Sequence, residues 1–241
     1  MQKKPNFLRE LNAAIFEEMA AGGKTNIVGL AGELKENVRE VTDLCGLRFN
    51  GYLAKLETVR PSGTADEVIV AFTDEAVSKL DDDIAGFEIA AGSRLLVCGK
   101  IQTLKDFKSG RVLVFILADF VALSQKAEAQ NDIALVGELA YKPTHRKTPK
   151  GKRISDIRVK VQNMLTAGAC YIPCICWQEQ ADEAAGWQQG DKVKLLGRYQ
   201  SREYSKLLDS ETGERETRTA YELSVNYIER IEEAKAPEAG E

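Results

Sequence analysis

The stretch GSRLLVCGKIQ at residues 92–102 returns as GDKVKLLGRYQ at residues 190–200, and this repeat decides the fold. Both glycines and the final glutamine of the first phrase recur 98 positions later. A second pair lies upstream, where NIVGLAGEL at 26–34 matches NDIALVGEL at 131–139. All four phrases have the short apolar runs of β-strands. A repeat of about 100 residues indicates two copies of one small β-domain rather than a solenoid of short units.

Glycines interrupt the apolar strands at matching places in the two copies. Gly32 and Gly99 in the first copy correspond to Gly137 and Gly197 in the second. Such glycines predict the bulges or sharp bends with which small barrels turn corners. In the second copy, residues 181–188 predict a short helix between the third and fourth of five strands. This is the plan of an OB-fold, a five-stranded Greek-key barrel.

The sequence therefore predicts an all-β protein of two tandem OB-folds preceded by a short helix. Asn6 can cap that helix after Pro5, and Gly22-Gly23 can end it. We expect the apolar stripe of this helix to pack within the protein or against a second copy. The predicted segments are a helical extension over 1–25, a first OB-fold over 26–124, a second over 131–231 and a disordered acidic tail over 232–241.

Composition excludes several classes of protein. No apolar run approaches the roughly 18 residues of a membrane helix, so we expect a cytoplasmic protein without membrane contact. Five cysteines, an odd number, fit a reducing compartment. A single histidine leaves little room for acid–base or metal chemistry, and no nucleophile–base constellation is present. We therefore predict no enzyme activity, no catalytic residue and no cofactor.

Positive charge is concentrated in the second copy. The net charge of the chain is −4, yet residues 141–160 hold eight Lys and Arg against one acidic residue. Residues 26–124 hold 11 Lys and Arg against 15 Asp and Glu. Since the local field at a surface decides polyanion binding, we predict that the second copy binds nucleic acid. The first copy is predicted to be a scaffold or dimerisation unit with little or no DNA contact.

The second copy resembles bacterial single-stranded DNA-binding proteins and their relative, the primosomal protein PriB. The resemblance rests on phrases in the family's order: IALVGEL at 133–139, TPKG at 148–151, YIPCICW at 171–177, GDKV at 190–193, GRYQSREY at 197–204 and RTAYE at 218–222. It covers 131–231 well and reaches 26–123 only through the repeat. It implies sequence-tolerant binding of single-stranded DNA in replication, recombination or repair, in the nucleoid. Because family members assemble four OB-folds, it also implies a homodimer of this chain.

One feature of the family is missing. Its members usually end in an acidic tail closed by Asp-Ile-Pro-Phe, which binds replication and repair proteins, whereas this sequence ends in Ala239-Gly240-Glu241. The internal DDDIAGF at 81–87 is interpreted as a loop or a helix start. Replication proteins therefore stay possible partners, but not through a tail of that type.

Single-stranded nucleic acid is bound by aromatic side chains that stack on bases and by cations that contact phosphates. By the resemblance, Tyr171, Trp177 and Tyr204 occupy the positions of stacking aromatics. A basic hairpin at 145–153 and the cations around Tyr204 would contact phosphates. The predicted contacts are Tyr171, Trp177, Tyr204, Arg146, Lys147, Lys150, Lys152, Arg153, Arg198, Arg202 and Lys206.

Structural explanations compete with these roles. Trp177 and Tyr171 could fill core or pack across strands, and the basic hairpin could be only a solvated loop. Tyr221 and Trp187 are assigned to the core. Cys170, Cys174 and Cys176 share one face of a strand, which raises the possibility of zinc. No nearby histidine or Cys-x-x-Cys pair completes four ligands, so buried thiols are favoured and no metal site is predicted.

Two other functions stay open. A PriB-like protein-interaction or primosome-assembly module would recruit a partner through the barrel surface and touch DNA only secondarily. An RNA-binding OB-fold protein would use the same stacking and phosphate contacts, which do not exclude a 2′-hydroxyl.

Overall fold

The computed structural model describes residues 25–77, 89–123, 128–208 and 212–231. In these ranges the chain has twelve strands, one short α-helix and one 3-10 turn, so the predicted all-β class is confirmed. The predicted N-terminal helix, except its last residue, lies outside the described residues. So do the stretch at 81–87 and the predicted acidic tail.

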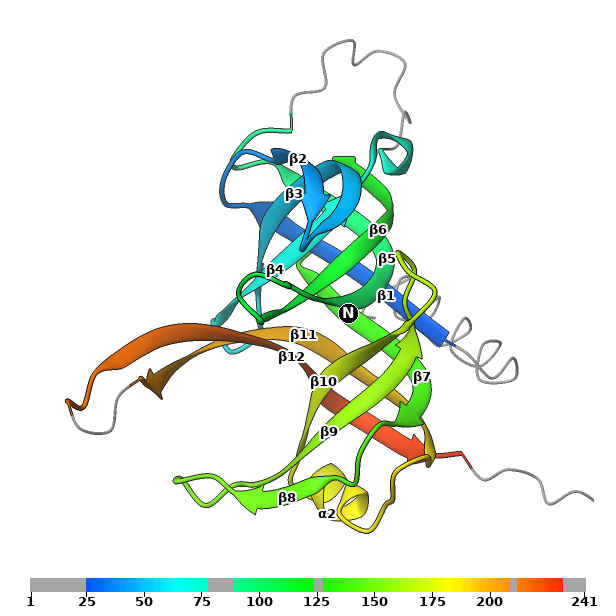
Figure 1. The fold of residues 1–241 in the computed structure, drawn as a ribbon, viewed down its shortest axis with the longest axis vertical. Helices are drawn as coiled ribbons and strands as arrows, with labels where there is room; N and C mark the ends of the chain where they lie inside the picture. Colours follow the sequence, from blue (N-terminus) through cyan, green and yellow to red (C-terminus); the bar gives the residue numbers. More distant parts are fainter. Residues whose placement is uncertain (1–24, 78–88, 124–127, 209–211, 232–241) are drawn as a thin grey trace, which may run out of the picture.

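Five of the first six strands form a closed ring, which we call the first ring (Figure 1). The order is β3-β4-β6-β5-β1, and β1 also pairs with β3, which closes the circle. β2 extends this ring at its edge by pairing with β3. The elements are β1 (Thr25–Leu34), β2 (Arg39–Leu44), β3 (Leu47–Val59), β4 (Ala65–Phe72), the 3-10 turn η1 (Asp74–Ala76), β5 (Arg94–Lys105) and β6 (Val112–Leu123).

The second half repeats this plan as the second ring, in the order β7-β11-β12-β10-β9 with β9 returning to β7. The predicted helix is present between β10 and β11, but it begins and ends earlier than expected. The elements are β7 (Gln130–Leu139), β8 (Thr144–Lys147), β9 (Arg153–Gln162), β10 (Ala169–Trp177), α2 (Glu179–Ala184), β11 (Lys192–Leu207) and β12 (Arg215–Arg230).

The two rings are joined through the repeated phrases themselves. β1 and β7 pair antiparallel, with Val28 opposite Ile133. Asn26 at the start of β1 exchanges two hydrogen bonds with the backbone of Ile101, at 2.8 and 2.9 Å. Its counterpart Asn131 does the same with Tyr199, at 2.8 Å each. The repeat therefore appears in space as a near two-fold arrangement, and buried residues of both rings form one continuous core.

Gly99 and Gly197 lie at the bulges that the sequence predicts. The register of β5 against β6 shifts between Cys98 and Gly99, and that of β11 against β12 shifts between Leu196 and Gly197. A Cβ atom at Gly197 would lie 2.4 Å from the carbonyl oxygen of Ser224. At Gly99 the clash with a backbone oxygen would be 2.2 Å. Only glycine permits this close approach of neighbouring strands.

We expect Gly197→Ala to destabilise the protein by about 1–3 kcal/mol, since the added methyl group forces two backbones apart. Gly186→Ala is the matched control, because the nearest atom to its Cβ would be 4.0 Å away. Thermal unfolding followed by circular dichroism compares the two. Equal melting temperatures for both variants would contradict the close approach at the bulge.

Three cysteines of β10 fill the interior of the second ring. Cys170, Cys174 and Cys176 are all at most 3% exposed, which agrees with the prediction of buried thiols. Burial raises the pKa of the Cys176 thiol to about 12, with the charges of Asp156 and Glu183 acting in the same direction. All five cysteines of the chain are free, and Cys98 is exposed.

We therefore expect a thiol reagent such as Ellman's reagent at pH 8 to label at most Cys45 and Cys98 in the folded protein. The three thiols of β10 are shielded and protonated at this pH, so they should react only after unfolding in denaturant. Mass spectrometry of the labelled peptides identifies the sites. Rapid labelling of Cys176 in the native state would contradict its burial.

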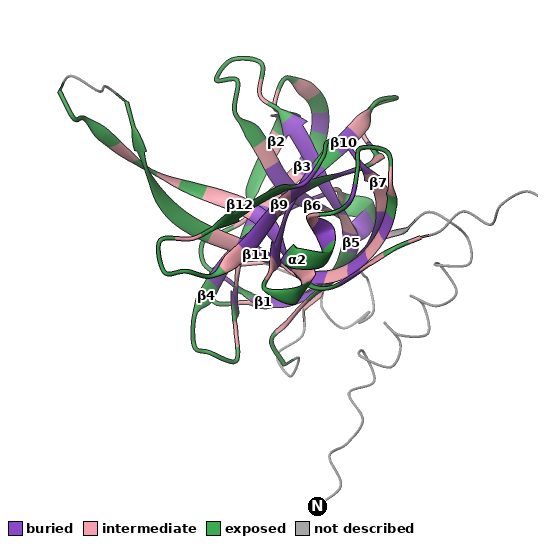
Figure 2. Ribbon diagram, turned by 90° about the horizontal axis from the view of Figure 1, so that it is seen from below, coloured by how far each residue is buried: buried purple, intermediate pink, exposed green. Residues whose placement is uncertain are grey.

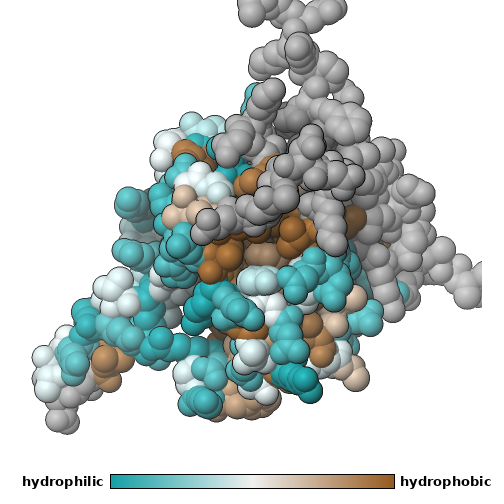
Figure 3. Space-filling model, turned by 90° about the horizontal axis from the view of Figure 1, so that it is seen from above, coloured by the Kyte–Doolittle hydropathy of each residue, from teal (hydrophilic) through white to brown (hydrophobic). Residues whose placement is uncertain are grey.

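The outer parts of β11 and β12 extend beyond the second ring as a two-stranded arm (Figure 1). Figure 2 shows the arm as mostly exposed, in contrast to the buried inner strands. Figure 3 shows it as a mainly hydrophilic projection. Leu207 and Leu208 near its end are exposed by 44% and 49%.

Candidate nucleic-acid interface

All four predicted contacts of β11 lie on one face of that strand. Side chains alternate between the two faces of a strand, and Leu195 and Tyr199 point into the core with no exposure. The alternate positions therefore point outward. They carry four of the predicted residues, which are Arg198, Arg202, Tyr204 and Lys206.

The aromatics of β10 share this outward direction. Buried residues occupy the alternate positions of the strand, which leaves Tyr171 and Trp177 on the outer face. The indole nitrogen of Trp177 donates to the hydroxyl of Ser224 at 3.2 Å, and Ser224 lies opposite Arg198 on β12. Trp177 is half-buried and Tyr171 is 42% exposed. Six residues of strand place these aromatics about 20 Å apart.

Tyr204 lies on the arm and is 38% exposed. The guanidinium of Arg202 is 5.8 Å from the centre of the Tyr204 ring, and Arg218 lies opposite on β12. Arg202 also donates to Glu222 at 2.9 Å, so part of its charge is neutralised. The arm thus offers an accessible aromatic ring bordered by cations.

The basic hairpin forms as predicted, with β8 paired to β9 around a turn in which Gly151 has a φ of +78°. Its cations are distributed over different directions. Arg146 donates to Asp156 at 2.7 Å. Arg153 makes two bonds of 2.8 and 2.9 Å to Asp182 on α2, away from the aromatics of β10. The structure therefore does not bring Arg153 to the outer face.

The remaining lysines of the predicted set are exposed. Lys147 lies in β8 beside Arg153, Lys150 lies in the turn, and Lys206 lies near the end of the arm. No ion-pair partner for them is found among the described residues. Their charges are available to a polyanion.

A hollow of about 530 Å³ brings three predicted residues together, namely Lys152, Trp177 and Arg198. Gln180, Gln200 and residues 224–226 of β12 also line it. The first ring contributes Arg60, from the turn between β3 and β4. The sequence analysis assigned no role to Arg60, because nothing in the sequence places that turn beside the second ring.

Residues 130–231 match the family model described as the Single-strand binding protein family. This match covers the second ring from β7 to β12. No curated protein matches the chain significantly. The resemblance noted from the sequence is therefore confirmed for the second ring, which is called the single-strand binding domain below.

Solved structures extend the similarity to both rings. A deletion variant of the single-stranded DNA binding protein from Thermus aquaticus matches with a TM-score of 0.64 at 21% identity, over 90% of this chain and 99% of that chain. The wild-type protein from the same organism matches with a TM-score of 0.64 at 19% identity, over 88% and 96%. At this identity the match shows a shared fold.

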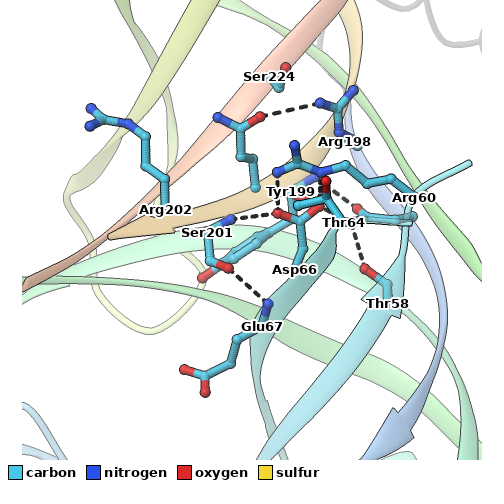
Figure 4. A network of polar contacts seen from close by, with 12 residues as sticks. Thr58, Arg60, Thr64, Asp66, Glu67, Arg198, Tyr199, Ser201, Arg202 and Ser224 are labelled. Atoms are coloured by element: carbon cyan, nitrogen blue, oxygen red, sulfur yellow. Dashed lines mark hydrogen bonds and ion pairs between the residues drawn. The ribbon is translucent and has the colours of Figure 1, made fainter. Parts of the chain in front are cut away.

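The junction between the first ring and the single-strand binding domain is polar (Figure 4). Asp66 of β4 is fully buried and accepts two bonds from Arg60, at 2.5 and 2.6 Å. It also accepts the backbone N–H of Ser201 in β11 at 2.9 Å, and Ser201 in turn accepts the N–H of Glu67 at 2.8 Å. Glu67 accepts the hydroxyl of Tyr221 at 2.5 Å. β4 is thereby fixed against β11.

Of the two aromatic residues assigned to the core, Tyr221 lies at this junction and Trp187 lies in the core of the second ring. Tyr221 is only half-buried, because it spans the junction and packs on Tyr199 with ring centres 5.9 Å apart. Trp187 is 7% exposed, so its core assignment is confirmed. Burial, followed by the bond to Glu67, raises the pKa of the Tyr221 hydroxyl.

Within the described residues, no three or more His, Cys, Asp or Glu side chains are grouped to hold a metal ion. No helix in this part of the chain is long and apolar enough to cross a membrane.

Proposed function

We propose that the protein binds single-stranded DNA with little sequence preference, through the outer face of the single-strand binding domain, and that both rings are OB-folds. The observation that carries this proposal is the shared face of Trp177, Arg198, Arg202 and Tyr204 on a domain of the single-strand binding protein family. An open face with aromatic rings and cations suits an unpaired strand, whose bases expose their flat surfaces.

The aromatic and cationic side chains of this face have different roles, which follow from the chemistry of single-stranded DNA. Tyr171, Trp177 and Tyr204 stack on bases, and every base offers a π-face, so stacking tolerates sequence. The cations around them contact phosphates, which gives affinity that falls with salt. The basic hairpin contributes through Lys147, Lys150 and Lys152, whereas Arg146 and Arg153 contribute less because each is paired to a carboxylate.

The biological role proposed is non-enzymatic protection and presentation of unpaired DNA in replication, recombination and repair, in the cytoplasm at the nucleoid. The similarity to a protein from Thermus aquaticus named for single-stranded DNA binding supports this proposal. A chain with two OB-folds would reach four as a homodimer, which we also propose.

Titration of the protein with oligo-dT at several salt concentrations tests the function, with tryptophan fluorescence as the signal. The chain has two tryptophans, and Trp187 is buried, so quenching reports mainly on Trp177. The proposal predicts quenching that saturates, and an affinity that falls linearly in log salt. Absence of binding at low salt would contradict it.

A further inference from the structure

Two arginines line the hollow beside Trp177, and one carboxylate partly neutralises their positive charge. Arg60 comes from the first ring, and Arg198 comes from β11 of the single-strand binding domain. Asp66 binds Arg60 with both carboxylate oxygens, whereas the partner of Arg198 among the described residues is the neutral side chain of Gln200, to which it donates at 3.2 Å. The hollow thus keeps an excess of positive charge, to which Lys152 adds at the rim.

The position of Arg60 is fixed by two sets of bonds. Its backbone N–H and carbonyl bond to Thr64 and Gly63 at 2.8 Å each, in a tight turn with Pro61. Its side chain is held by Asp66, which is itself bonded to the backbone of Ser201 in the other ring. Arg60 therefore faces the single-strand binding domain in a defined orientation (Figure 4).

The guanidinium of Arg198 lies in unfavourable surroundings. Its Nε is buried and has no hydrogen-bond partner within the described residues. Burial lowers the pKa of the Arg198 guanidinium, and the charge of Arg60 lowers it further. An orphaned donor and two like charges around an open hollow are conditions that a bound anion relieves.

We propose that Arg60 and Arg198 jointly hold one backbone phosphate of single-stranded DNA, so that the strand crosses the junction between the rings next to Trp177. Guanidinium groups donate two parallel bonds to phosphate oxygens, which suits this role better than a lysine would. The inference rests on the proposed function, and it gives the acidic first ring a direct contact with DNA.

The test compares Arg60→Gln, Arg198→Gln and the control Arg48→Gln, which removes the same charge from an exposed position on β3. Oligo-dT affinity is measured for each by fluorescence anisotropy across a salt series, together with the melting temperature. We expect each of the first two variants to lose about ten-fold in affinity and to reduce the salt slope by about one. We expect the control to change affinity by less than about two-fold.

The two arginines make one contact, so their effects should not add. The double variant Arg60→Gln/Arg198→Gln should reduce the salt slope by about one, not two. Arg198→Gln should leave the melting temperature unchanged or raise it, because it removes a repelling charge and an unpaired donor. Arg60→Gln should lower it, because Asp66 loses its partner, so Arg198→Gln is the deciding variant.

The outcomes distinguish two claims, namely the proposed function and the phosphate contact shared by Arg60 and Arg198, which we call the clamp. If the wild type binds oligo-dT and both single variants bind as tightly as Arg48→Gln with an unchanged slope, the clamp is wrong and the proposed function stands. If Arg198→Gln lowers the melting temperature without changing affinity, the arginine is structural and the clamp is also wrong. If the wild type itself does not bind, the proposed function fails first.

Discussion

The double variant Trp177→Ala/Tyr204→Ala is expected to bind oligo-dT at least about 30-fold more weakly than the wild type. Each stacked base contributes on the order of 1–3 kcal/mol, so the loss of two stacking positions removes about 2 kcal/mol or more. Both residues lie on the outer face, and their removal leaves the cations in place. The salt slope should therefore stay near its wild-type value. Equilibrium titration by fluorescence anisotropy measures both quantities.

Tyr227→Ala is the matched control for the loss of an exposed aromatic ring. Tyr227 is 44% exposed, but its hydroxyl donates to Glu229 at 2.5 Å, and Glu183 is close enough to raise its pKa further. These carboxylates make its surroundings unsuitable for a phosphate backbone. If the double variant and Tyr227→Ala lost the same modest amount of oligo-dT affinity, the stacking positions would be wrongly assigned.

Replacing Asp66 with alanine is expected to cause the largest loss of stability, about 3 kcal/mol or more. Asp66 is fully buried and accepts bonds from Arg60 and from the backbone of Ser201. Its removal leaves a partly buried guanidinium without its counter-ion and a backbone N–H without an acceptor. Because these bonds join the two rings, we expect the rings to unfold in one transition. Urea unfolding should show the lower free energy of unfolding in that transition.

Asp182→Ala is the control for this variant. Asp182 also accepts two bonds from one arginine, at 2.8 and 2.9 Å, but 45% of its side chain is exposed. An exposed pair of this kind contributes about 1 kcal/mol or less. If Asp66→Ala and Asp182→Ala lowered stability equally, the burial of the junction would be contradicted.

Patterns among neighbouring residues predicted much of the fold. The repeat at 92–102 and 190–200 indicated two similar β-units, and the interrupting glycines placed bulges at Gly99 and Gly197, where the register shifts. Alternation along β10 placed its three thiols on one face, where they are buried, whereas the stacking role of Tyr171 and Trp177 was predicted from the resemblance alone. These features depend on the two-residue period of a strand and on close backbone approach, both of which are written in adjacent residues.

Non-local pairing could not be predicted. The antiparallel union of β1 with β7 brings the turn at Arg60 beside Arg198, which is 138 positions away in the chain. Charge counting ranked Arg153 with the other cations of the hairpin, but α2 provides Asp182 as its partner. Sequence reasoning identifies which side chains could contact a polyanion, and only the packing of the rings shows which of them are already neutralised.

The most direct test of the account is a competition experiment on the wild-type protein. Labelled oligo-dT is displaced by unlabelled oligo-dT, by the duplex of dT with dA, and by oligo-U RNA of the same length. We predict that single-stranded DNA competes efficiently and that duplex DNA, whose bases are stacked and paired, competes at least about ten-fold less well. Equal competition by duplex would contradict stacking on the outer face, and stronger competition by oligo-U would identify RNA as the ligand.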